Sequence, residues 1–177
     1  MREFACTPAQ TVGPFFHCAL PYPGDNRLVG DDHPDAIRLY GRVYDGAGDG
    51  IPDALVELWQ ADPDGDVVAH PGSLRRGAGF TGWGRCATDA AGDYRFTTLT
   101  PGPPSFFAIV VFARGLLNRL FTRAYLPGAD LDRLLSGIDP ARRDTMVCVA
   151  EPTGYRFDIH LQGEHETVFL MYHGDPR

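Results

Sequence analysis

Alternating apolar and polar residues predict that most of this chain folds as short β-strands. Over residues 37–45, Ile37, Leu39 and Val43 alternate with arginine and tyrosine, a period of two that is typical of a strand with one buried face. The glycine-rich turn DGAGDG at 45–50 ends this segment. Runs with strand character, separated by turn residues, continue along the chain. They cover residues 54–62, 80–89, 94–99, 106–114 and 118–126.

The segments after residue 100 differ in character. The run FFAIVVFAR at 106–114 is almost continuously apolar, which favours a strand that is buried on both faces. Helices are predicted only beyond it, at 131–137 and at 139–144. In the second of these, Asp139 is suited to cap the helix and Pro140 to occupy its first turn.

The C-terminal segment predicts a β-hairpin with a definite register. A two-residue turn at 162–163 would place His160 opposite His165. This register separates an apolar face from a polar face. The apolar face holds Tyr155, Phe157, Ile159, Leu161, Val168 and Leu170. The polar face holds Arg156, Asp158, His160, His165 and Thr167.

The spacing of these strands predicts an all-β fold, a two-sheet sandwich with long loops. We interpret residues 1–177 as a single domain. An N-terminal arm covers residues 1–35, and the sandwich core covers 36–172 with one or two short helices near 131–144. A long loop is expected at about 62–79, and no internal repeat is visible.

Composition excludes several classes of function. The net charge of −7 opposes binding to nucleic acid, whose phosphates would be repelled. No apolar run approaches the roughly 18 residues of a membrane helix, and the segment MREFACTPAQ lacks the apolar core of a secretory signal. The cysteines lie far apart without a CxxC pair, which favours free thiols in the cytoplasm. They are Cys6, Cys18, Cys86 and Cys148.

Two polar clusters are candidates for metal binding. His160 and His165, with Asp158 on the same predicted face, have the donor types of a divalent metal site. The simpler interpretation is a pair of surface histidines at a strand end. The acidic run at 62–66 faintly resembles a calcium loop, but Pro71 stands where the closing glutamate belongs, so a turn is expected.

Four long motifs point to one family. They are TPAQTVGPFFH at 7–17, GRVYDGAGDGIPDALVELWQADPDGD at 41–66, FARG at 112–115 and YRFDIHLQGEHETVFL at 155–170. Together they resemble the intradiol ring-cleaving dioxygenases, in order and from about residue 6 to residue 171. The resemblance implies a β-sandwich in which two tyrosines and two histidines hold a non-haem ferric ion. Phenolate oxygen and imidazole nitrogen suit such an ion.

The chain departs from this family at each position implied for a metal ligand. Val67 stands where the first tyrosine is expected, and the loop that should carry the second has shrunk to residues 103–105, Pro-Pro-Ser. The two histidines are replaced by Phe106 and Ala108. These side chains carry no metal-binding donors, so we expect no metal and no catalytic residue in this chain.

The resemblance therefore points to the α subunits of two-chain family members. In these, Fe(III) sits in a homologous β subunit, and a carboxylated catechol and O2 react at the α/β interface. The resemblance implies that α contributes a pocket wall. Its residues here are Thr11, Gly13, Pro14, Phe15 and Arg114. Phe15 stands where a tyrosine is expected. A guanidinium at Arg114 suits a benzoate carboxylate.

Blander interpretations remain open at this point. The arm motif can be a simple turn, Arg114 a solvated charge, and Trp59 and Trp83 packing residues. The chain as a whole can be a non-enzymatic β-sandwich binding module, or a dioxygenase that uses the histidine pair. If it needs a partner, we expect the arm to be mobile in isolation and residues 106–112 to form an exposed apolar patch.

Overall fold

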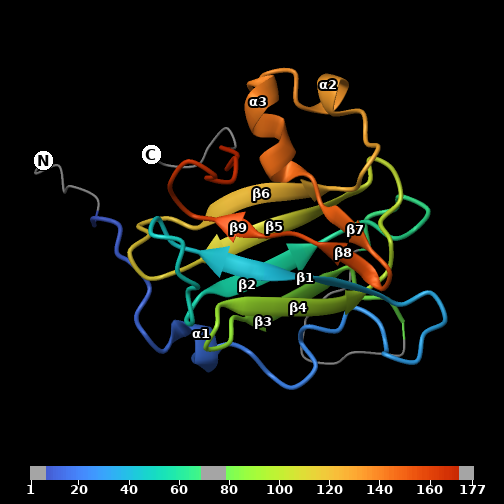
Figure 1. Ribbon diagram of the computed structural model, residues 1–177. Helices are drawn as coiled ribbons and strands as arrows, with labels where there is room; N and C mark the ends of the chain where they lie inside the picture. The colour runs from blue at the N-terminus through green and yellow to red at the C-terminus, as the bar shows by residue number, and fades with distance from the viewer. Residues whose placement is uncertain (1–6, 69–78, 172–177) are drawn as a thin grey trace, which may run out of the picture.

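The computed structural model describes residues 7–68 and 79–171, in which the strands form two packed sheets (Figure 1). The first sheet has the order β4-β1-β8-β7, with β9 also paired to β1. Its strands are β1 (Ile37–Tyr44), β4 (Asp93–Thr98), β7 (Val149–Glu151), β8 (Gly154–Arg156) and β9 (Ile159–His160). The second sheet has the order β3-β2-β5-β6. Its strands are β2 (Leu55–Trp59), β3 (Trp83–Ala87), β5 (Phe106–Phe112) and β6 (Leu120–Tyr125).

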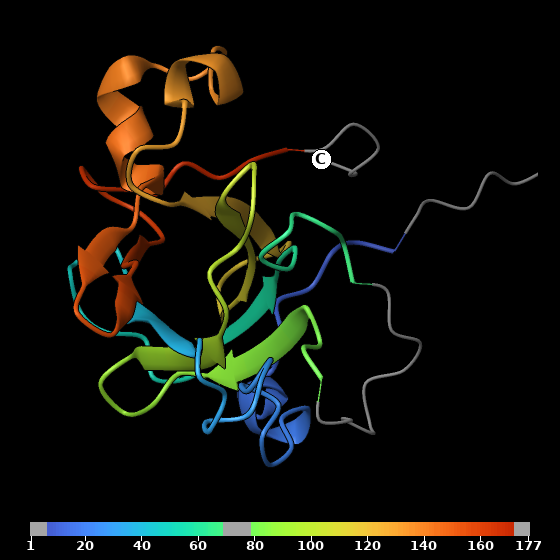
Figure 2. The same ribbon diagram turned by 90° about the vertical axis from the view of Figure 1, so that its right-hand side faces the viewer.

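Short helices lie at two ends of this sandwich (Figures 1 and 2). The arm forms α1 (Phe16–Ala19), while α2 (Leu131–Leu134), α3 (Pro140–Arg143) and the 3-10 turn η1 (Asp144–Met146) lie at the opposite end. The Asp139 side chain accepts a hydrogen bond from Ala141 N, and Pro140 begins the helix, which confirms both predictions about this helix start. The predicted all-β sandwich with short helices is therefore confirmed.

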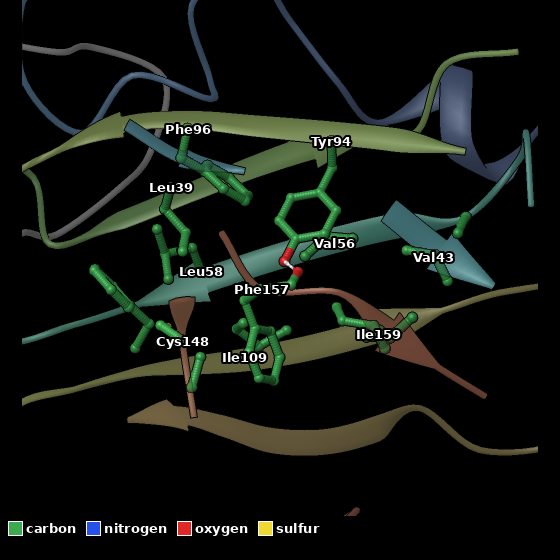
Figure 3. Packing of buried hydrophobic residues seen from close by; sticks show 14 of the residues in the cluster. Leu39, Val43, Val56, Leu58, Tyr94, Phe96, Ile109, Cys148, Phe157 and Ile159 are labelled. Carbon is green, nitrogen blue, oxygen red and sulfur yellow. Dashed lines mark hydrogen bonds between the residues drawn. The ribbon is translucent and has the colours of Figure 1, made fainter. Parts of the chain in front are cut away.

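The core fills the space between the sheets (Figure 3). Alternate residues of β1, β2, β4 and β5 point inward, and their packing removes a large apolar area from water. The members with no exposure include Leu39, Val43, Val56, Leu58, Phe96 and Phe107. Tyr94 is buried among them, and its hydroxyl donates a 2.5 Å hydrogen bond to Phe157 O, which satisfies the one polar atom of its side chain.

Strand β5 differs in part from the prediction. Its inward residues are fully buried, but Phe106, Ala108 and Phe112 on the other face are only half-buried. The strand lies between β2 and β6, and the arm covers one end of it, where the rings of Phe16 and Phe112 lie 5.4 Å apart. The expected exposed apolar patch at 106–112 is therefore wrong, because neighbouring segments cover much of this strand.

The predicted C-terminal hairpin is also wrong. Residues 154–160 form β8 and β9, which both pair in parallel with β1. His160 faces Thr167 instead of His165, since His160 N donates to Thr167 Oγ1 at 3.0 Å and Thr167 N donates to His160 O at 3.0 Å. The turn is therefore longer than two residues, and Thr167 is buried instead of lying on a polar surface.

The predicted apolar face of the C-terminal segment is split between two clusters. Phe157, Ile159 and Leu161 belong to the main core. Val168 and Leu170 instead pack on a second cluster with Tyr125 beneath the helical end. The strand β7, which pairs with β8, was not predicted, because its short Val-Ala-Glu segment has no long alternating pattern.

The chain between β8 and β9 passes very close to the backbone of β1. A Cβ atom placed on Gly41 would lie 1.9 Å from Phe157 O. Phe157 N also donates to Tyr40 O at 2.8 Å. Only glycine at position 41 allows the C-terminal segment to pass this closely over β1.

Candidate functional site

The N-terminal arm is fixed to the turn that follows β5. Gly115 N donates a 2.8 Å hydrogen bond to Thr11 Oγ1. Gly115 adopts φ of 89°, which suits glycine at this turn. Phe16 N donates to Gly13 O at 3.1 Å and starts the short helix α1. These contacts tie the arm to the body of this chain, while its mobility without a partner stays a prediction.

Arg114 lies beside this fixed arm, at the end of β5. Its Nε forms an ion pair with the Asp53 carboxylate. The Arg114 side chain is 56% exposed, whereas the Asp53 side chain is only 11% exposed. The ion pair thus joins a half-exposed guanidinium to a largely buried acid. It can attract an anion that approaches this end of the sheet.

The structure brings some of the predicted wall residues together. Thr11 and Arg114 are joined through Gly115, the next residue along the chain. Gly13 has open space around its Cα, and the Phe15 ring is 75% exposed. The arm therefore offers an exposed aromatic ring and a glycine-proline turn to whatever approaches it.

A small cavity lies between the arm and the turn after β5. Its volume is about 200 Å³, and Val12, Phe112, Leu116 and Leu117 are among its lining residues. The lining is mixed, because Gln10, Asn118 and Arg119 also border it. Sequence reasoning missed this cavity, since only the packing of the arm on the turn creates it.

The acidic run at 62–66 is a turn, as predicted. The carboxylate of Asp62 accepts hydrogen bonds from Asp64 N at 3.0 Å and from Asp66 N at 2.9 Å. Both bonds go to Oδ1, in the manner of an aspartate that orders its own turn. Val67 follows the turn with its side chain 84% exposed. Pro71 and the rest of the long loop at 69–78 lie outside the described residues.

The loop at 101–105 packs directly against this turn. Gly102 N donates to Asp62 O at 2.9 Å, and a Cβ atom on Gly102 would lie 2.4 Å from Pro63 O. The two loops that should carry the tyrosines of the resembled family are therefore in backbone contact. The side chains there are Val67, Pro103, Pro104 and Ser105, none of which is a phenol.

The two positions implied for histidines share the outward face of β5 with an arginine from β6. Ala108 pairs with Arg123 across the two strands. The Arg123 guanidinium lies over Phe106, with its Cζ 4.5 Å from the ring centroid, and Nη1 donates to Tyr125 Oη at 3.3 Å. Hydrocarbon side chains beneath a fixed cation do not fit a ferric ion. Among residues 7–68 and 79–171, no group of three or more histidine, cysteine or acidic residues is arranged to hold a metal.

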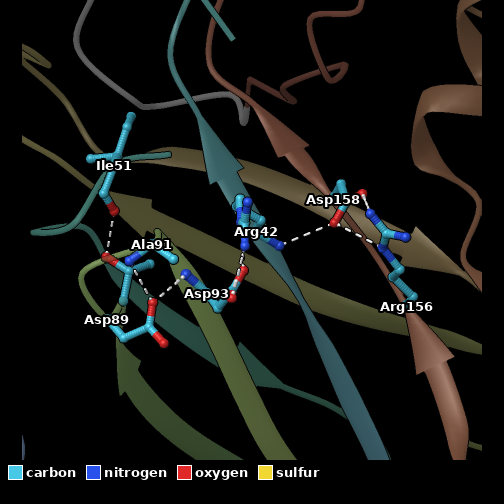
Figure 4. Close-up of polar contacts among 8 residues, drawn as sticks. Arg42, Ile51, Asp89, Ala91, Asp93, Arg156 and Asp158 are labelled. Atoms are coloured by element: carbon cyan, nitrogen blue, oxygen red, sulfur yellow. Dashed lines mark hydrogen bonds and ion pairs between the residues drawn. The ribbon is translucent and has the colours of Figure 1, made fainter. Parts of the chain in front are cut away.

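The histidine pair has other partners. His160 stacks on Tyr44 with centroids 4.6 Å apart, and the His165 ring lies edge-on at 6.1 Å. Asp158 accepts from Arg42 N at 3.1 Å and from Arg156 Nη2 at 2.6 Å, as Figure 4 shows. Burial lowers the pKa of His160, and its neighbour His165 adds to this effect.

The tryptophans and the cysteines are two further groups of residues with predictions from the sequence. Trp59 and Trp83 contact each other at 5.9 Å, but Trp59 is 51% exposed and lies outside the core. Cys18, Cys86 and Cys148 are free thiols, as predicted. Cys6 lies outside the described residues. No helix in the described parts of the chain is long and apolar enough to cross a membrane.

Comparison with known proteins decides the family. The family model described as Dioxygenase matches residues 13–111. The protocatechuate 3,4-dioxygenase alpha chain of Pseudomonas putida is 36% identical over 196 residues, covering 94% of this chain and 96% of the relative. The chain belongs to the dioxygenase family.

Other dioxygenases extend the similarity to both kinds of subunit. The protocatechuate 3,4-dioxygenase beta chain of Burkholderia cepacia is 32% identical, covering 90% of this chain and 77% of the relative. The dioxygenase domain of a carbohydrate-binding fusion protein from Streptomyces sp. SirexAA-E has a similar structure. Its TM-score is 0.59 with 25% identity, covering 89% of this chain and 98% of that domain. The sandwich is thus a dioxygenase fold over nearly the whole chain.

Proposed function

We propose that this chain is the non-iron-binding α subunit of a protocatechuate 3,4-dioxygenase. The complex opens the ring of 3,4-dihydroxybenzoate between its two hydroxyl-bearing carbons and incorporates both atoms of O2. The product is 3-carboxy-cis,cis-muconate. Two observations together support the proposal. The chain is similar to an alpha chain over 94% of its length, and the residues at the implied ligand positions do not suit iron.

The proposed partner is a homologous β chain, in αβ protomers of a larger oligomer. The similarity of this chain to a beta chain supports a pairing of two related sandwiches. Fe(III) bound in the partner supplies the activation of the catechol towards O2. We further propose that the complex works in the cytoplasm, which suits the free thiols of the described cysteines.

Our proposal gives this chain three tasks at the interface. The guanidinium of Arg114 attracts the carboxylate of the aromatic acid and orients the ring. The arm residues Thr11, Gly13 and Pro14 close one side of the pocket, with the exposed ring of Phe15 beside them. Closure excludes water, which strengthens the charge interactions inside.

The decisive experiment compares the isolated chain with the co-expressed pair. We expect the isolated chain to contain no stoichiometric iron and to be inactive on 3,4-dihydroxybenzoate. The pair should show the red-brown colour of ferric tyrosinate, one iron for each αβ unit, and ring cleavage. Stoichiometric iron in the isolated chain, measured by elemental analysis, would refute the proposal, as would a chain that stays monomeric and has no affinity for the β chain.

A further inference from the structure

We propose that Asp53 is a positioning residue that fixes Arg114 for the carboxylate of the aromatic substrate. The inference rests on the proposed function of Arg114. Asp53 contacts Nε of the guanidinium, and this leaves the edge formed by Nη1 and Nη2 for a second carboxylate. Asp53 itself does not touch the substrate.

The two residues lie close together because the second sheet pairs the strands next to them. Leu55 at the start of β2 pairs with Phe112 at the end of β5 in an antiparallel ladder. Asp53 and Arg114 lie in the turns just beyond this last pair, Asp53 two residues before Leu55 and Arg114 two residues after Phe112. The ion pair therefore joins the two turns at this end of the β2–β5 ladder, which the pairing of the strands brings close together.

The backbone on the Asp53 side is rigid. Thr88 is buried and forms hydrogen bonds to the turn before β2 through both its backbone and its side chain. Ala54 N donates to Thr88 Oγ1 at 3.0 Å, Thr88 N donates to Ala54 O at 3.0 Å, and Thr88 Oγ1 donates to Ile51 O at 2.6 Å. A largely buried carboxylate on such a turn has little freedom to follow the arginine, so the arginine must follow the carboxylate.

The backbone on the Arg114 side is fixed as well. The hydrogen bond from Gly115 N to Thr11 Oγ1 ties the residue after Arg114 to the arm. The side chain of Arg114 is thus held at Nε and its backbone is held one residue later. An arginine constrained in this way loses little further freedom when it binds a carboxylate, which is the advantage of preorganisation.

The test measures KM and kcat in the complex with the β chain, for 3,4-dihydroxybenzoate and for catechol, which lacks the carboxylate. We expect Asp53→Ala to raise KM for the acid about tenfold, with kcat and the KM for catechol unchanged. Asp53→Asn keeps an acceptor for Nε–H and should give a smaller rise. Asp31→Ala, which removes a different acid paired with Arg27 and Arg38, should change neither constant.

A double-mutant cycle separates positioning from a general structural role. In an Arg114→Ala background, Asp53→Ala should have no further effect, because the group that it positions is gone. The proposal is overturned if Asp53→Ala still raises KM in that background, or if it raises KM equally for the acid and for catechol.

A second measurement uses the isolated chain and is independent of activity. In ¹⁵N-labelled protein, the Nε–H signal of Arg114, assigned by its loss in Arg114→Ala, should be protected from exchange. Protection should persist in Asp53→Asn and disappear in Asp53→Ala. Failure of this pattern refutes the positioning role. If protection is as expected but Arg114→Ala affects the acid and catechol equally, the proposed function of Arg114 fails instead, and Asp53 then positions nothing for catalysis.

Discussion

Two regions at opposite ends of the second sheet differ in character. At one end, the arm and the Arg114 turn keep polar groups that are held by hydrogen bonds and an ion pair. At the other end, the positions implied for metal ligands carry Val67, Phe106 and Ala108, with the Arg123 guanidinium fixed over the phenyl ring. A chain that binds substrate but not metal needs only the first region intact. Under the proposed function, recognition and redox chemistry are divided between two chains of the same fold.

The largest effect is expected from removing the cation in the polar region. Arg114→Ala should raise KM for 3,4-dihydroxybenzoate about tenfold to hundredfold in the complex, since hydrogen bonds to charged groups contribute ~1.5–3 kcal/mol. Arg114→Lys should recover part of this, because it keeps the charge but loses the forked geometry. Steady-state kinetics with Arg119→Ala as the control test this. Equal effects of the two alanine variants would contradict the role of Arg114.

The next largest effect is expected on the rate at which Cys18 in the arm is chemically labelled. Cys18 is exposed at the end of α1, so iodoacetamide should label it rapidly in the isolated chain. Binding of the β chain should slow labelling about tenfold or more if this face becomes buried. Burial raises the pKa of Cys148 to about 12, so its thiol stays protonated and unlabelled in both states. Mass spectrometry of the labelled peptides follows each site, and an unchanged rate at Cys18 would remove the arm from the interface.

A smaller effect is expected from removing the hydrogen bond that holds the arm to the turn after β5. Thr11→Val keeps the shape of the side chain but removes the acceptor for Gly115 N. One such hydrogen bond contributes ~1 kcal/mol, so amide exchange in the arm should accelerate about fivefold. Thr11→Ser retains the hydroxyl and should resemble the native chain. Hydrogen exchange measured by mass spectrometry would contradict the contact if the serine and valine variants behaved alike.

No effect is expected from restoring ligands in the other region. A chain with Val67→Tyr, Phe106→His and Ala108→His should still contain no stoichiometric iron. The shortened loop at 101–105 supplies no second phenol, and the Arg123 guanidinium repels a cation at this place. His160→Ala with His165→Ala should likewise leave metal content unchanged. Elemental analysis with the unaltered chain as reference decides both, and iron in the first variant would show that ligand identity alone had been lost.

Local sequence patterns predicted where the strands and helices lie better than they predicted which strands pair with one another. Alternation identified β1, the turn at 89–93 identified the start of β4, and the Asp139–Pro140 pair identified the start of α3, because each signal depends on neighbouring residues. The C-terminal hairpin was wrong because buried Thr167 pairs with His160 through its own side chain. A buried polar residue that forms a hydrogen bond with a backbone group cannot be distinguished in the sequence from a polar residue at the surface.

The candidate site, too, could be predicted only in part from the sequence. Residues such as Thr11 and Arg114 were found through resemblance, and their positions stay a prediction as pocket wall. Asp53 and Arg123 were not found, since their importance comes from neighbours that only strand pairing brings close. Asp53 meets Arg114 only because pairing of β2 with β5 brings the two adjoining turns together, and Arg123 lies opposite Ala108 only in the β5–β6 ladder. Such cross-strand neighbours cannot be read from one sequence.

The parallel pairing of β1 with β8 and β9 has a consequence for biosynthesis. Strand β1 emerges early from the ribosome, yet two of its three partners come from the last quarter of the chain. Until then one edge of β1 has no neighbour, and the apolar side chains beneath it are uncovered. The sandwich therefore closes only after nearly all of the chain has been made, and a prematurely terminated product should aggregate where the full-length chain does not.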